Sequence, residues 1–311
     1  MTGMTLPVQD RTPRSSPKRR LRRGRSSPAV EALKIVALSV CCLAVIGPFL
    51  MVISTSLADP LQIDTGGGMV IWPERPTLEA YRVIFAGGQV TRALAVTGFV
   101  TVVGTAVALT VTSMLAYALS RQKLPFNRII LMGVLMTMLF SAGMIPVYLT
   151  VKGFGLLDSL WSLIIPVSVS AFNCIVMRAF FQNLPAELSE AAAIDGASEM
   201  RIFLTIVLPL SKPILAAIGL FYAVGFWNTF FSALLYLNDQ EKWPIQLVLR
   251  QYLINNAAIS AGDAVAAGDL PPPQPALQMA ILIVSLVPIA CVYPLLQKHF
   301  TKGFLTGAVK G

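Results

Sequence analysis

Charged side chains are scarce in this chain of 311 residues. Asp, Glu, Lys and Arg together make up 13% of the sequence, about half of the roughly 25% that is typical of soluble domains. Hydrophobic residues make up 55%, and the mean hydropathy is +0.71. Such a composition leaves too little polar surface for a soluble globule, and it also excludes a disordered chain. The sequence therefore predicts an all-α, polytopic membrane protein.

Side chains that bind metals or carry out catalysis are also rare. His299 is the only histidine, which excludes a histidine-rich metal site. No Gly-x-x-x-x-Gly-Lys-[Ser/Thr] phosphate-binding loop and no catalytic constellation occur. We therefore expect no metal, no cofactor and no catalytic site in this chain. The cysteines lack zinc-site spacing and are interpreted as small hydrophobic residues: Cys41, Cys42, Cys174 and Cys291.

Six long runs contain no Asp, Glu, Lys, Arg or His. Each has 18 residues or more, enough to cross the roughly 30 Å hydrocarbon core of a bilayer as a helix. We predict one transmembrane helix on each run, the fourth of them extending to residue 181. The runs are Ile35–Leu57, Leu94–Leu119, Ile129–Val151, Leu160–Met177, Pro213–Leu237 and Leu277–Leu296.

Basic residues are distributed unevenly between the two sides that six spans create. The segments on the side of the termini are 1–34, 120–128, 178–212 and 297–311. They hold 18 Lys and Arg against 6 Asp and Glu, whereas segments 58–93, 152–159 and 238–276 hold 6 against 9. Because basic loops are retained in the cytoplasm, both termini are predicted to be cytoplasmic. Residues 1–30 are predicted to be a disordered basic tail, and no aromatic residue interleaves its basic residues to support binding of nucleic acid.

The six apolar runs offer no group that could couple transport to protons, because ionisable side chains at membrane depth are missing from them. Sodium coupling through broken helices stays open, since backbone carbonyls can hold that ion. If the chain belongs to a pump, its energy is expected to enter through a cytoplasmic surface. The longest predicted cytoplasmic connection between spans covers residues 178–212.

This segment predicts two short helices separated by a glycine turn. Pro185 suits the first turn of a helix that Asp195-Gly196 ends, because Gly adopts a positive φ readily. Ser198 is expected to cap a second helix, which Pro209 and Pro213 then kink or end. The second helix carries an apolar stripe at helical spacing: Met200, Phe203, Leu204 and Val207.

The same segment resembles the EAA loop of ABC importer permeases, in which EAA is followed by three residues, G, nine residues and IxLP. Glu190-Ala191-Ala192, Gly196 and Ile206-Val207-Leu208-Pro209 fit that spacing at every fixed position. Other motifs, among them Gly143-Met-Ile-Pro146 and Trp227-Asn228, are similar to the MalG-like subunits of sugar importers. The resemblance extends to the LplC/YtcP-like branch, associated with complex or uronic-acid-containing oligosaccharides. The basic tail departs from the pattern.

The resemblance implies the type I importer (MetI-like) permease fold over residues 31–311, in a bacterial cytoplasmic membrane. It implies a carbohydrate importer with a second permease subunit, two ATP-binding subunits that use the ATP, and an extracellular solute-binding protein. The resemblance makes residues 182–212 the coupling loop, and coupling to the ATPase is carried over to Glu190, Ala191, Ala192, Asp195 and Gly196. A contact of the C-terminal tail with the ATPase is carried over to Lys302, Gly303, Lys310 and Gly311.

Two further regions carry alternatives that the sequence leaves open. The last external loop, 238–276, either enters the sugar cleft of the binding protein or is merely solvated, and its candidate contacts are Gly262, Asp263, Gly268 and Asp269. A set of rings and amides either lines a sugar path or bridges helices and meets lipid headgroups: Phe172, Asn173, Tyr222, Trp227, Asn228 and Phe231. The competing functions are a secondary carrier or channel for a small solute, and a membrane-anchored scaffold.

Overall fold

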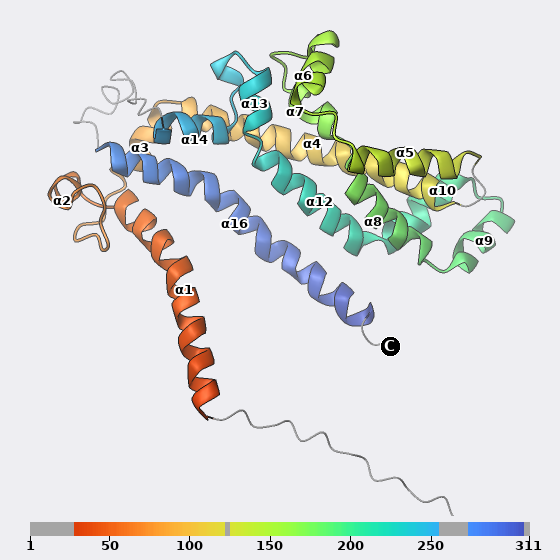
Figure 1. The fold of residues 1–311 in the computed structure, drawn as a ribbon, viewed down its shortest axis with the longest axis horizontal. Coiled ribbons are helices and arrows are strands. Elements are labelled where there is room, and N and C mark those ends of the chain that lie inside the picture. The colour runs from red at the N-terminus through yellow and green to blue at the C-terminus, as the bar shows by residue number, and fades with distance from the viewer. Residues whose placement is uncertain (1–27, 122–124, 255–272, 308–311) are drawn as a thin grey trace, which may run out of the picture. The chain divides into compact units, whose positions relative to one another are not determined.

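The computed structural model describes residues 28–121, 125–254 and 273–307, and this part of the chain contains helices and no strand (Figure 1). Residues 1–27 of the predicted basic tail lie outside the described residues. Three helices are long and apolar enough to cross a membrane alone, and three bent pairs raise the number of candidate spans to as many as six. The predicted all-α class is confirmed. The long helices are α1 (Pro28–Ser56), α4 (Gln89–Ser120) and α16 (Gln274–Gly307).

The chain divides into two units, Met1–Pro48 and Phe49–Gly311. In the first unit the described residues form most of α1, which begins before the predicted run and has Glu31 in its first turn, where a carboxylate complements the helix dipole. The side chains of Leu33 and Leu43 are 68% and 71% exposed. A helix with apolar side chains exposed in this way is suited to a hydrocarbon environment.

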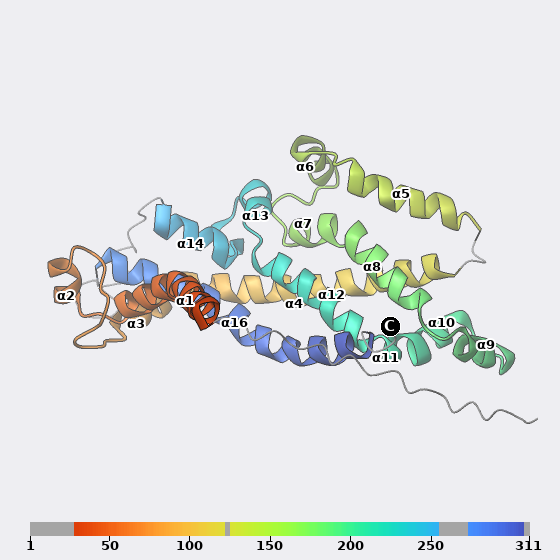
Figure 2. The same cartoon turned by 60° about the horizontal axis from the view of Figure 1, so that its bottom comes forward.

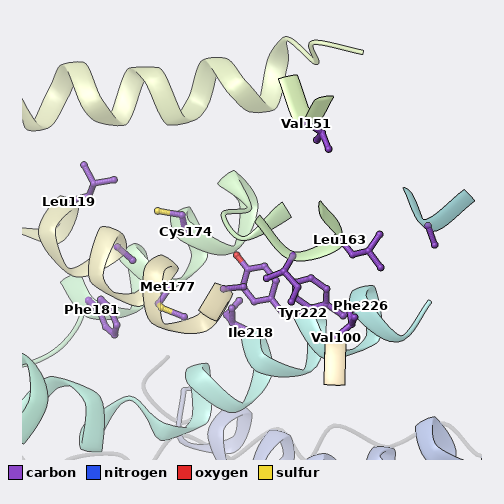
Figure 3. Packing of buried hydrophobic residues seen from close by; sticks show 14 of the residues in the cluster. Val100, Leu119, Val151, Leu163, Cys174, Met177, Phe181, Ile218, Tyr222 and Phe226 are labelled. Carbon is purple, nitrogen blue, oxygen red and sulfur yellow. The ribbon is translucent and has the colours of Figure 1, made fainter. Parts of the chain in front are cut away.

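The core of the second unit is built by α4, α8 (Ala171–Gln182) and α12 (Lys212–Trp227), which pack side by side (Figure 1, Figure 2). Gly104 allows a close approach, because a Cβ at this position would lie 2.9 Å from the ring of Phe226. Figure 3 shows Cys174, Met177 and Ile218 in this cluster, and all three are fully buried. The interpretation of Cys174 as a small hydrophobic residue is confirmed.

A second cluster gathers the short helices of the predicted external side. It joins α2 (Pro60–Thr65), α3 (Glu79–Ala86) and α14 (Ile245–Ile254) to the beginnings of α4 and α16, with Ile63 and Ile245 almost fully buried. The hydroxyl of Thr97 on α4 accepts a hydrogen bond of 2.8 Å from the backbone N–H of Ile245. This bond fixes the start of α14 on α4.

Breaks interrupt three of the predicted spans. The third run forms α5 (Asn127–Leu139) and α6 (Met144–Gly153), which meet at 119° beside Gly143, whose φ is +79°. The fourth run forms α7 (Trp161–Ile164), the 3-10 turn η1 (Ile165–Val167) and α8, with a bend of 53°. The fifth run does not form the single helix predicted over Pro213–Leu237. Instead, α12 ends at Trp227 and α13 (Phe231–Tyr236) is a separate helix. The turn η3 (Gln240–Lys242) follows.

Candidate coupling surface and transport path

The predicted coupling loop forms two short helices joined by a tight turn. The first, α9 (Ala186–Ile194), begins directly after Pro185, which therefore precedes the first turn instead of lying in it as predicted. At its end, the N–H of Ala197 donates to the carbonyl of Ala192 (2.9 Å) and the N–H of Gly196 to that of Ala193 (3.1 Å). These two bonds form a Schellman motif, and the φ of +79° at Gly196 is the left-handed conformation that the motif requires. The predicted glycine turn is confirmed.

The two faces of α9 differ in what they contact. Ala192 is half-buried and packs with Ala197 against the main core cluster, so its side chain supports the helix from within the chain. Glu190, Ala191 and Asp195 are exposed, and neither carboxylate has an ion-pair partner within the described residues. Ile194 is 86% exposed at the end of α9. Sequence reasoning missed this residue, although an apolar residue directly before Asp-Gly is a visible signal.

The second helix begins where predicted but does not keep the predicted apolar face. The hydroxyl of Ser198 accepts from the N–H of Arg201 (3.4 Å) and caps α10 (Glu199–Ile202). A π-helical turn, η2 (Phe203–Val207), and α11 (Leu208–Leu210) follow, and the chain then turns by 84° into α12 between Pro209 and Pro213. The π turn departs from the spacing of an α-helix, so only part of the predicted stripe is buried. Phe203 and Val207 are buried, whereas Met200 and Leu204 are about half exposed.

A cluster of three polar side chains attaches this second helix to the end of α4 that is predicted to be cytoplasmic, and we call it the Tyr117 cluster. The hydroxyl of Tyr117 donates to a carboxylate oxygen of Glu199 (2.6 Å) and accepts from Nη2 of Arg121 (2.6 Å). The same nitrogen lies 3.3 Å from the Glu199 carboxylate. The Tyr117 ring also packs on Phe203, with 4.9 Å between ring centroids. These contacts attach α10 to one end of α4, and the other end of α4 contacts α14.

An aromatic cavity of about 310 Å³ lies where α12, α13 and α7 meet. It brings together three of the predicted path residues, Tyr222, Asn228 and Phe231, whereas Phe172, Asn173 and Trp227 do not line it. Sequence reasoning missed several other lining residues: Phe221, Phe226, Thr229, Phe230 and Ser232. The dense mixture of rings and polar groups after Trp227 is a signal for the last three of them, whereas Phe221 and Phe226 precede it within an apolar run.

Two of the predicted path residues bridge helices, and both are aromatic residues, for which contact with lipid headgroups was the predicted alternative. The hydroxyl of Tyr222 is bonded to that of Thr112 on α4 (2.6 Å) and accepts from the N–H of Ser170 at the start of α8 (3.0 Å). The indole N–H of Trp227 donates to the carbonyl of Ser285 on α16 (3.0 Å). Tyr222 thus lines the cavity while its hydroxyl joins three helices. Figure 3 shows Tyr222 close to Ile218 and Phe226 in the core cluster.

A group of hydrogen bonds centred on Asp158 lies on the predicted external side, and we call Asp158 with its partners Asn238, Asp239 and Lys242 the clasp. Asp158 accepts hydrogen bonds from the backbone N–H groups of Asn238 (3.2 Å) and Asp239 (3.0 Å) and from Nζ of Lys242 (2.9 Å). The bond from Lys242, followed by that from Asp239, holds the pKa of the Asp158 carboxyl below its usual range. The same pairing raises the pKa of Lys242. The clasp anchors the beginning of the last external loop.

The remaining predicted contacts cannot be placed. Gly262, Asp263, Gly268 and Asp269 lie outside the described residues, as do Lys310 and Gly311. Lys302 and Gly303 fall within α16, where the backbone alone is described.

Comparison with known proteins gives one consistent answer. Residues 108–305 match the family described as "Binding-protein-dependent transport system inner membrane component". The chain is 46% identical over 264 residues to the polygalacturonan/rhamnogalacturonan transport system permease protein YtcP of Bacillus subtilis, covering 85% of this chain and 92% of that protein. It is also 46% identical over 265 residues to the protein LplC of the same organism, covering 85% and 89%.

A solved structure with a TM-score of 0.83 and 30% identity covers 93% of this chain and all of its counterpart. It is the crystal structure of a bacterial ABC transporter involved in the import of the acidic polysaccharide alginate. The fold comparison and the family match over residues 108–305 therefore agree with each other. The chain belongs to the family of inner membrane components of binding-protein-dependent transport systems.

Proposed function

We propose that this chain is a permease subunit of an ATP-binding-cassette importer that moves an oligosaccharide across the bacterial cytoplasmic membrane. The relatives at 46% identity include a permease for polygalacturonan and rhamnogalacturonan, and the structural neighbour takes part in importing acidic alginate. These names favour a sugar that carries uronic acids. The observation that carries the proposal is the Schellman turn at Gly196, which holds an exposed helix end at the predicted cytoplasmic surface.

The exposed end of α9 fits the role of a docking surface for an ATP-binding subunit. Glu190 and Asp195 offer charge, Ala191 allows close approach, and Ile194 offers an apolar side chain at the end of the helix. The Tyr117 cluster would pass movement of this surface to α4. The ATP is then hydrolysed by two partner subunits, and the permease contributes no catalytic residue. Lys302, Gly303, Lys310 and Gly311 belong to a second contact with those subunits.

The aromatic cavity fits a sugar path that a second permease subunit completes. Rings such as Phe221 and Phe231 can stack on the apolar faces of sugar rings, and the amide of Asn228 can bond to their hydroxyl groups. The extracellular solute-binding protein would release its ligand above this cavity. The last external loop, with Gly262, Asp263, Gly268 and Asp269, is the proposed contact with that protein.

Substitution of Glu190 tests the docking role directly. Loss of one member of a buried interfacial pair costs about 2–5 kcal/mol, whereas an exposed pair is worth about 0–1 kcal/mol. We expect Glu190→Ala to reduce copurification with the ATP-binding subunits and ATP-dependent uptake strongly, and Glu190→Gln to have an intermediate effect. Glu74→Ala, on the predicted external side, is the control and should behave like the wild type. Wild-type assembly and uptake by Glu190→Ala would show that Glu190 is ordinary solvated surface.

A further inference from the structure

A polar edge borders the aromatic cavity, and it is formed by one face of α14. Gln246 and Arg250 are four residues apart on this helix and therefore lie on the same face. The amide of Gln246 donates to the amide oxygen of Asn228 (3.4 Å), and the guanidinium carbon of Arg250 lies 5.1 Å from the centroid of the Phe230 ring. Asn228 and Phe230 both line the cavity. Two independent contacts thus place this face of α14 at the cavity.

The opposite face of α14 explains why these two polar residues are directed there. Ile245 and Val248 lie on that face and are fully buried in the second cluster, and Tyr252 on the same face is also buried there. This packing fixes the rotation of the helix about its axis. Gln246 and Arg250 are only partly exposed, so they are neither core residues nor freely solvated ones.

Arg250 has no acidic partner within the residues that the structure describes. The acidic side chains nearest to α14 in sequence are already engaged, because Glu241 pairs with Arg92 (2.9 Å), and Asp239 lies 3.4 Å from Lys242. The Phe230 ring orients the guanidinium through a cation–π contact without neutralising its charge. The residues that line the cavity carry no charge of their own. Arg250 is therefore the one cation, among the described residues, that contacts the wall of the cavity and lacks a counter-charge.

We propose that Arg250, supported by Gln246, is a specificity-determining residue that recognises the carboxylate of an acidic sugar passing the cavity. Guanidinium presents planar, paired N–H donors that match a carboxylate, and charge-assisted bonds of this kind are about twice as strong as neutral ones. Rings that line the cavity, such as Phe221 and Phe231, stack on the sugar. The amides of Asn228 and Gln246 bond to its hydroxyl groups. The proposal rests on the proposed function, because it assigns a substrate charge to the same path.

The test compares an acidic substrate with its neutral counterpart in the complete complex. The permease pair, the ATP-binding subunits and the binding protein are reconstituted in proteoliposomes. ATP-dependent uptake is then measured for an oligogalacturonide and for its methyl ester. We expect Arg250→Gln to reduce uptake of the acidic oligosaccharide about tenfold or more and to leave the ester unaffected. Arg250→Lys should restore part of the acidic uptake, because it retains the charge.

Arg82→Gln is the matched control, since Arg82 is an exposed arginine on α3 that does not line the cavity. It should leave uptake of both substrates unchanged. Equal loss of both substrates in Arg250→Gln would mean that Arg250 only supports the structure, and unchanged acidic uptake would remove it from the path. Either result overturns the inference. If the wild type imports the ester alone, the inference fails and the proposed function stands. If it imports neither substrate, the inference fails, and absence of any ATP-dependent sugar import would refute the proposed function as well.

Discussion

Gly196 is the residue on which the shape of the proposed coupling surface depends. Its φ of +79° costs an L-residue about 1–2 kcal/mol, and Asn tolerates this conformation better than Leu. Among the described residues, no atom outside the turn itself lies within 4 Å of a Cβ built at this position. Strain of the turn is therefore the only effect that the permease itself should experience. A partner that approaches the turn closely would add a second effect.

We predict that Gly196→Leu leaves the isolated permease folded but weakens binding of the ATP-binding subunits, with Gly196→Asn between it and the wild type. The thermal unfolding temperature of the permease alone measures the first effect. Retention of ATP-binding subunits during purification measures the second. If Gly196→Leu retains these subunits as well as the wild type does, the turn does not touch them.

The Tyr117 cluster connects two helices, α10 and α4. The hydroxyl of Tyr117 is the only atom of that side chain bonded to both Glu199 and Arg121, so Tyr117→Phe removes these bonds and keeps the ring packed on Phe203. We expect a loss of about 0.5–1.5 kcal/mol, because Glu199 is 70% exposed. Such a loss should leave the fold intact but loosen α10 from α4.

The expected consequence of Tyr117→Phe is a lower ratio of sugar imported to ATP hydrolysed, measured in proteoliposomes. A merely structural role would lower the amount of folded protein and leave that ratio unchanged. Tyr148→Phe is the control. The centroid of the Tyr148 ring lies 6.2 Å from that of Tyr236, and the Tyr148 hydroxyl has no hydrogen-bond partner within the described residues. A wild-type ratio in Tyr117→Phe would exclude the cluster from coupling.

The clasp on the predicted external side should make stability depend on pH. The pKa of Asp158 is lower in the folded state than in the unfolded state, so its contribution is present above the usual aspartate range and is lost as the pH falls below it. The pKa of Lys242 is raised, so its contribution is lost only at strongly alkaline pH. Asp158 has a φ of +57°, and Asn accepts this conformation about as well as Asp.

We predict that Asp158→Asn lowers the unfolding temperature at pH 7 and that the difference from the wild type shrinks towards pH 3. Thermal unfolding of the purified protein across this range measures the effect. Because Asn keeps the backbone conformation, the change reports the charge and not strain. Parallel curves for the two proteins at every pH would contradict the assignment of the clasp.

The same elements show what the sequence could and could not predict. Uncharged runs predicted the membrane segments, and the glycine turn and Ser198 cap followed from local chemistry that needs no tertiary contact. The breaks at Gly143 and between α7 and α8 could not be predicted in this way, because the hydropathy of a segment does not depend on the direction of its backbone. The Tyr117 cluster joins residues that are 82 positions apart, and the clasp joins residues 84 apart. Pairings of that kind depend on how helices pack, which periodicity does not encode.

At the scale of the whole second unit, α4 connects the proposed coupling surface to the helices of the predicted external side. Its 32 residues extend about 48 Å at 1.5 Å per residue, more than the roughly 30 Å hydrocarbon core. Thr97 holds α14 near its first end, and Tyr117 holds the coupling segment near its last end. Figure 1 and Figure 2 both show α3 and α14 at one end of α4 and α9 and α10 at the other. We expect a displacement of the proposed coupling surface to move α4, and to reach the cavity through the bond between Thr112 on α4 and the hydroxyl of Tyr222 in the cavity wall.

This arrangement requires α9 and α2 to face opposite sides of the membrane, as the uneven distribution of basic residues predicts. Leu61 on α2 is 75% exposed and Ile194 on α9 is 86% exposed, so a cysteine at either position is accessible to a reagent. In a background without Cys41, Cys42, Cys174 and Cys291, we expect a membrane-impermeant maleimide to label Leu61→Cys in intact cells. Ile194→Cys should be labelled only after permeabilisation, in cells that lack the ATP-binding subunits and cannot cover it. Labelling of Ile194→Cys in intact cells would show that the predicted topology is inverted. The Gly196 turn would then lie outside the cell, where it could not contact an ATP-binding subunit.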